Sequence, residues 1–142
     1  MYNYTDLGFT KIRAPDHVFS LIQEFWKKNK DKQREEEWPI GNVYVNHWEG
    51  ATGMVSVEDD SLEGGGFVLK QHIWNAARDT ISAWTGQQLA ECSLYGIRGY
   101  KEGAIVAPHV DRLHHSASAI IKGDQEVNEE GNRAGIGQDW PT

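Results

Sequence analysis

The stretch LYGIRGYKEGAIVAPHVD, residues 94–111, decides the fold predicted for this chain. Two runs of strand composition, residues 94–100 and 104–109, flank a short polar segment at 101–103. Gly103 can adopt the positive φ that a tight hairpin turn requires. The stretch therefore predicts two strands joined by a tight turn.

His109 and Asp111 lie two residues apart at the end of this stretch. On a strand, their side chains point to the same face. A non-haem Fe(II) site is commonly built from two histidines and one carboxylate, which leaves other positions for substrate and oxygen. We therefore take His109 and Asp111 as candidate metal ligands. Arg98 and Tyr100 share one face of the preceding strand, and a phenol beside a guanidinium suits a dianionic keto acid.

Residues of the same stretch also resemble a known family: Tyr100, Gly103, Pro108, His109 and Asp111. They resemble the Tyr-x-x-Gly and Pro-His-x-Asp segment of the prolyl-4-hydroxylase-like 2-oxoglutarate/Fe(II)-dependent oxygenases. The resemblance implies that His109 and Asp111 bind Fe(II) and that Tyr100 hydrogen-bonds a carboxylate of 2-oxoglutarate. It also implies a dioxygenase that hydroxylates an unidentified substrate, with oxygen and 2-oxoglutarate as co-substrates and with release of succinate and carbon dioxide.

The chain departs from this family's pattern in its last third. The family has a second metal-binding histidine several strands later, followed by an arginine or lysine that pairs with the far carboxylate of 2-oxoglutarate. Here the later histidines are His114 and His115, and the cations beyond residue 112 are Lys122 and Arg133. A truncation, an inactive paralogue, a site completed by another subunit, or metal binding by one of these two histidines would each account for the difference. The metal triad is incomplete, so enzymatic activity is left open.

Amphipathic patterns predict two helices before the hairpin. Apolar residues recur at helical spacing over residues 15–28 and again over 67–84, with Gly86 as the stop of the second helix. Strand composition occurs in three further segments: 43–48, 54–57 and 116–121. The chain is therefore predicted to be α+β, with N-terminal helices packed on a partial double-stranded β-helix, which is a jelly-roll or cupin-like sheet.

We expect residues 1–122 to form an oxygenase-like domain with an incomplete jelly roll, because too few strands are present for a complete one. Residues 123–142 are polar and acidic and are expected to form a flexible tail. The charged run at residues 27–37 is expected to be a solvated helix end or loop. Cys92 is expected to be a buried small apolar residue.

Composition excludes several classes of partner. The formal net charge of −7 argues against binding to nucleic acid or to anionic membranes, because both need clustered positive charge. A single cysteine cannot form an internal disulfide and fits a reducing compartment. The first residues lack the pattern of a signal peptide, and no apolar stretch is long enough for a membrane span. The expected location is cytoplasmic.

Two other function classes compete with the dioxygenase prediction. One is a catalytically inactive remnant that binds metal weakly or associates with itself, for example as a homodimer through an unpaired sheet edge. The other is a cupin-like binding domain without metal, in which His109 and Asp111 form only a hydrogen-bonded pair. Succinate production, metal content and oligomeric state would distinguish the three.

Overall fold

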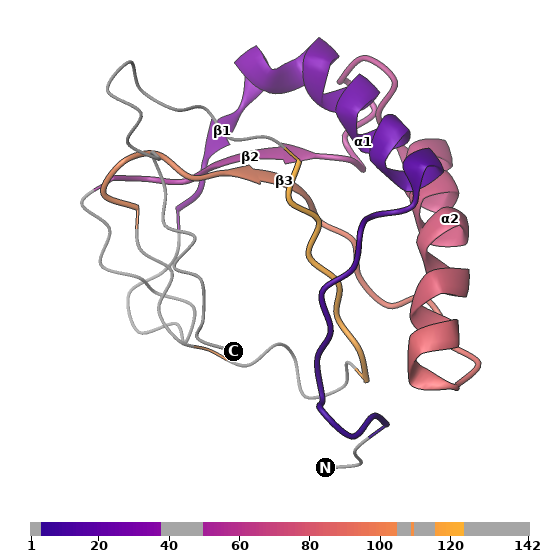
Figure 1. Ribbon diagram of the computed structural model, residues 1–142. Helices are drawn as coiled ribbons and strands as arrows, with labels where there is room; N and C mark the ends of the chain where they lie inside the picture. Colours follow the sequence, from indigo (N-terminus) through magenta and orange to yellow (C-terminus); the bar gives the residue numbers. More distant parts are fainter. Residues whose placement is uncertain (1–3, 38–49, 105–108, 110–115, 124–142) are drawn as a thin grey trace.

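The computed structural model describes residues 4–37, 50–104, 109 and 116–123. These residues form two α-helices, a short 3-10 helix and a three-stranded antiparallel sheet (Figure 1). The architecture is therefore α+β, as predicted. Among the described residues, no helix combines the length and the apolar character needed to cross a membrane.

The first helix, α1, runs over Asp16–Asn29, one residue away from the predicted bounds at each end. Pro15 precedes it, and the carbonyl of Pro15 accepts the N–H of Phe19 at 3.0 Å. Proline suits this end of a helix because its fixed φ is already helical and it has no N–H to satisfy. Val18 and Phe25, seven residues apart, are buried on one face of the helix.

The charged run after α1 contains a strand, so its prediction as a helix end or loop was only partly right. The 3-10 helix η1, Lys30–Lys32, follows α1, and strand β1, Arg34–Glu35, follows η1. Both residues of β1 are exposed, as expected for charged side chains. They nevertheless form a strand, because their backbone groups pair with those of the next strand.

Strand β2, Gly53–Ser56, is the centre of the sheet. It pairs antiparallel with β1 on one side and with β3, Gly96–Gly99, on the other. The register places Met54 opposite both Arg34 and Arg98. The strand predicted at residues 43–48 lies outside the described residues.

The second helix, α2, runs over Phe67–Thr85 and ends at Gly86 as predicted. Gly86 has a φ of 65°, in the left-handed region that glycine adopts without a Cβ clash. Both helices pack on the same face of the sheet (Figure 1). Phe25 of α1 and Ile73 of α2 join Val55 and Val57 in the buried core. Leu21, Ile22, Trp26, Leu62, Leu69, Leu94 and Ile97 surround this core.

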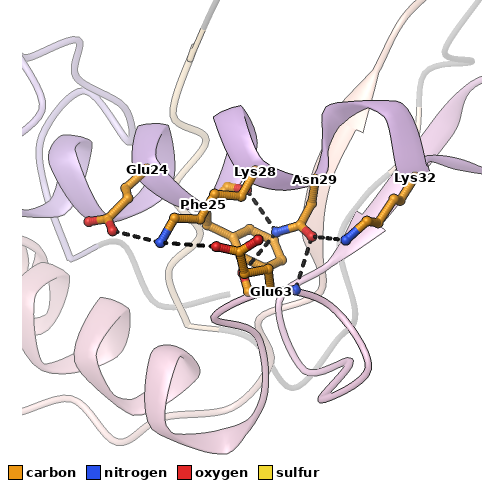
Figure 2. A network of polar contacts seen from close by, with 6 residues as sticks. All are labelled: Glu24, Phe25, Lys28, Asn29, Lys32 and Glu63. Atoms are coloured by element: carbon orange, nitrogen blue, oxygen red, sulfur yellow. Dashed lines mark hydrogen bonds and ion pairs between the residues drawn. The ribbon is translucent and has the colours of Figure 1, made fainter.

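A buried asparagine fixes the end of α1 to the loop between β2 and α2. Asn29 has no exposed surface, and its Nδ2 donates to the carbonyls of Phe25 and Glu63 at 3.0 Å each. Its Oδ1 accepts the N–H of Glu63 at 3.1 Å and the Nζ of Lys32 at 3.3 Å. Figure 2 shows these contacts beside the ion pairs that Lys28 makes with Glu24 and Glu63. The side chain thus joins two segments that are distant in sequence.

Two predictions about the later part of the chain were wrong. Residues 116–121 form no strand, and Ile120 is 98% exposed. The residues of this segment have the composition of a strand. A strand also needs backbone hydrogen bonds to a neighbouring strand, and composition does not show whether one is present. Cys92 is exposed, because it lies in the surface connection between α2 and β3. The second strand of the hairpin, at residues 104–109, lies almost entirely outside the described residues.

Candidate functional site

Strand β3 carries two of the predicted site residues to one face of the sheet. Arg98 stands opposite Met54, whose neighbour Val55 points into the helix-covered core. Because side chains alternate along a strand, Arg98 and Met54 lie on the face opposite the helices. Tyr100 comes two residues after Arg98, just past the end of β3, and continues the same alternation. The sheet therefore separates this polar face from the core.

The predicted turn after β3 is confirmed. The N–H of Ala104 donates to the carbonyl of Lys101 at 3.0 Å, and Gly103 has a φ of 79°. Gly103 also accepts a backbone hydrogen bond from Gly50 at 3.3 Å. The turn thus has a fixed position against the segment that leads into β2, and the chain reverses direction before His109.

Arg98 forms a bidentate ion pair with a residue to which the sequence assigned no role. Its Nε donates to Glu36 Oε2 at 2.6 Å, and its Nη2 donates to Glu36 Oε1 at 2.8 Å. The hydroxyl of Thr52 donates to the same Glu36 Oε2 at 2.6 Å. The N–H of Glu36 donates to the carbonyl of Thr52 at 2.9 Å, so Glu36 extends the β1–β2 ladder by one residue. This Glu36–Arg98 pair therefore spans all three strands.

Burial within the pair is unequal. The side chain of Glu36 is 11% exposed, and Thr52 is fully buried beside it. The side chain of Arg98 is 33% exposed, and Tyr100 is 52% exposed. The pair raises the pKa of Arg98, mainly through the hydrogen bonds to Glu36 and to a smaller degree through a hydrogen bond with Tyr100. The Glu36 carboxylate is thus the more buried member of the pair, and the Arg98 guanidinium is the more exposed one.

The four predicted site residues are described to different extents. Arg98 lies in β3, and Tyr100, just past its end, contributes to the raised pKa of Arg98. His109 is exposed, whereas Asp111 lies outside the described residues, as do His114 and His115. Within the part of the chain that the structure describes, no three His, Cys, Asp or Glu side chains are grouped as a metal site. The metal ligands therefore remain predictions.

Glu36 was missed because it lies between Glu35 and Glu37 in a charged run. Nothing in the sequence separates these three carboxylates. The separation comes from the strand pairing, which places Glu36 opposite Thr52 on the face of Arg98 and leaves Glu35 exposed beside Gly53. Strand alternation predicts only that Arg34 and Glu36 lie on one face and Glu35 and Glu37 on the other.

The same face carries a second arginine in a different setting. Arg34 of β1 forms an ion pair with Asp59 at 3.4 Å, and its side chain is 79% exposed. A shallow hollow near this pair is lined in part by Glu36, Met54 and Ser56. Arg34 thus offers an internal reference for Arg98, because it has the same charge, face and sheet but a long and exposed ion pair.

No protein-family model, curated protein or solved structure matches this chain.

The contacts of Arg98 decide how 2-oxoglutarate would fit at this place. Glu36 already accepts the Nε and one Nη2 hydrogen of Arg98, so this edge of the guanidinium is occupied by a carboxylate of the chain itself. A guanidinium has five N–H donors, and three of them are not used in this pair. A second carboxylate at Arg98 would therefore have to use these remaining donors.

Proposed function

We propose that this chain is a domain of the Fe(II)/2-oxoglutarate-dependent dioxygenase type, with a partial jelly-roll sheet. The proposal is carried by one observation. Arg98 lies on the face of β3 opposite the helices, and Tyr100, two residues later, continues the same alternation and contributes to the raised pKa of Arg98, directly before the turn that leads to His109. This arrangement is the one expected if β3 presents a co-substrate site to a metal bound by His109 and Asp111. The sequence resemblance described above supports the same assignment.

In this proposal, His109 and Asp111 hold Fe(II), and Tyr100 and Arg98 bind 2-oxoglutarate. Iron and 2-oxoglutarate together would supply the hydroxylation chemistry, with succinate and carbon dioxide as products. The chain's own contribution is to orient the keto acid through Tyr100 and Arg98 and to fix the two ligands on one side of the turn. The primary substrate is not specified by these residues, because a fold alone does not define a substrate.

An anaerobic titration with Fe(II), in the presence and absence of 2-oxoglutarate, tests the proposal. We expect a visible charge-transfer band that requires both additions and that disappears in His109→Ala and Asp111→Asn. His72→Ala is the matched control, because His72 is an exposed histidine on α2, outside the stretch of sequence that carries the proposed ligands. A folded protein without the band, or a band that survives in His109→Ala, would rule the proposed site out.

The bidentate Glu36–Arg98 pair favours a second candidate function, a catalytically inactive remnant. Glu36 offsets the positive charge that a dianionic keto acid would seek. Such a remnant would bind metal weakly, or would associate with itself through the edge of the sheet. Metal binding without succinate formation, across a panel of candidate substrates, would support it. Sedimentation of the chain as a dimer would support self-association.

A further inference from the structure

The Glu36–Arg98 pair leaves one edge of the guanidinium unused. Arginine can engage carboxylates along two edges, one formed by Nε and a terminal nitrogen and the other formed by the two terminal nitrogens. Glu36 takes the first edge through Nε and Nη2. The second edge belongs to the more exposed member of the pair, and Tyr100 follows Arg98 by two residues on the same side of the sheet by strand alternation.

We propose that Glu36 is a positioning residue, which turns Arg98 so that its outer edge and the hydroxyl of Tyr100 form a receptor for one carboxylate of a small acid. The inference rests on the proposed function for the identity of that acid, which is 2-oxoglutarate. It adds to that function a residue outside the stretch that resembles the oxygenases. Glu36 does not touch the ligand and acts through Arg98.

Burial decides against the opposite arrangement, in which the ligand displaces Glu36. Glu36 accepts three hydrogen bonds, from Arg98 twice and from the fully buried Thr52 once. Displacement would leave a nearly buried carboxylate with one donor, and an uncompensated buried charge is costly. An incoming carboxylate therefore binds outside the pair. Because Glu36 neutralises Arg98, the receptor depends on directed hydrogen bonds more than on net charge.

The test is a titration of the metal-free 142-residue chain with 2-oxoglutarate, measured by isothermal titration calorimetry in every variant and by NMR at the Nε–H of Arg98 in the variants that keep this residue. Arg98→Gln should weaken binding about tenfold, because it removes charge-assisted hydrogen bonds to the ligand. Glu36→Gln should weaken binding about fivefold, since a glutamine amide has one oxygen and a donor NH2 in place of two acceptor oxygens and cannot hold the guanidinium through both Nε and Nη2. Tyr100→Phe should weaken it about threefold through the loss of one hydroxyl.

Two control variants separate orientation from general charge. Glu35→Gln removes a neighbouring exposed carboxylate of β1, and Arg34→Gln removes the exposed arginine of the same face. Both should leave the affinity unchanged. The diamide of 2-oxoglutarate serves as the control ligand, and the preference for the acid over the diamide should fall in Glu36→Gln. A purely structural role for Glu36 would lower stability without changing this preference in the folded protein.

Unchanged or tighter binding by Glu36→Gln would overturn the inference, because Glu36 would then be a bystander or a competitor. Absence of any 2-oxoglutarate-dependent shift in the unmodified chain would overturn it as well. Should Glu36→Gln fail to fold, Tyr100→Phe still tests the receptor, since it removes only a hydroxyl from a half-exposed ring. If 2-oxoglutarate binds as expected but no charge-transfer band forms with Fe(II), only the proposed function is ruled out. If the band forms but Glu36→Gln binds 2-oxoglutarate with unchanged affinity, only this inference is ruled out.

Discussion

Two polar clusters join distant segments of this chain, and they are built in opposite ways. Asn29 is neutral and fully buried, and three of its four hydrogen bonds go to backbone atoms of α1 and of the loop before α2. The Glu36–Arg98 pair is ionic, and its arginine is one-third exposed. A neutral cluster that protein atoms satisfy completely serves the fold. A charged cluster with an open edge can serve a ligand as well.

Asn29→Ala is expected to have the largest effect on stability. It leaves the N–H of Glu63 without its acceptor and two carbonyls without their donor around a fully buried side chain, so we expect a loss of about 3 kcal/mol in the free energy of unfolding. Chemical denaturation measures this loss. Asn75→Ala, at an exposed position of α2, is the control and should change stability by less than about 0.5 kcal/mol. Equal effects of the two variants would show that the buried cluster is not a main support of the fold.

Gly96→Ala tests the strand that carries the charged cluster. A Cβ on Gly96 would collide with the backbone carbonyl oxygen of Val55, which cannot move aside as a side chain could. We expect a loss of about 2 kcal/mol, within the range for overpacking, together with a displacement of Arg98 from Glu36. Thermal unfolding gives the first and the Nε–H signal of Arg98 gives the second. Gly123→Ala, where a Cβ meets nothing within 4 Å, should leave both unchanged.

The sequence predicted the helix-covered half of the molecule better than the polar half. The repeat of apolar residues in α1 and α2 reflects burial on one face, and Gly86 marks the end of α2 because glycine is favoured in the left-handed region. Helices show these signals locally. Their bounds were therefore predictable within one residue.

The charged cluster was not predictable, because it depends on strand pairing over a long separation. Arg98 was selected for its position beside Tyr100, but its partner Glu36 is 62 residues away in sequence. One of three consecutive glutamates is brought to Arg98 by the register of β1 on β2. The same limit explains residues 116–121, where strand composition was read without knowledge of a partner strand.

Glu36→Gln is expected to destabilise the fold less than Asn29→Ala. It weakens three hydrogen bonds and leaves Arg98 without its counter-charge, but Arg98 reaches solvent and water replaces part of the loss. We expect a loss of about 1 kcal/mol, discounted for solvent screening. Denaturation of Glu36→Gln beside Glu35→Gln measures it. A loss as large as that of Asn29→Ala would mean that the charged cluster is chiefly structural, which would weaken its assignment to a ligand.

The smallest effect is expected at Asp59. This carboxylate makes an ion pair with the exposed Arg34 and accepts local hydrogen bonds from Ser61, so the two contributions to its pKa can be compared. The hydroxyl and the N–H of Ser61 donate to Asp59 and lower its pKa, whereas Arg34, at 3.4 Å, contributes least. A lowered carboxyl pKa stabilises the fold above the unfolded pKa, and this stability is lost as pH falls through the folded pKa. Ser61→Ala should therefore raise the pKa of Asp59 toward its ordinary value and move acid destabilisation to higher pH. NMR titration of the Asp59 carboxyl carbon measures this change, and Arg34→Gln should shift the same pKa less. A larger shift of the Asp59 pKa in Arg34→Gln than in Ser61→Ala would show that the exposed Arg34 affects this carboxyl more than its ion-pair distance indicates. The contrast between Arg34 and Arg98 would then fail.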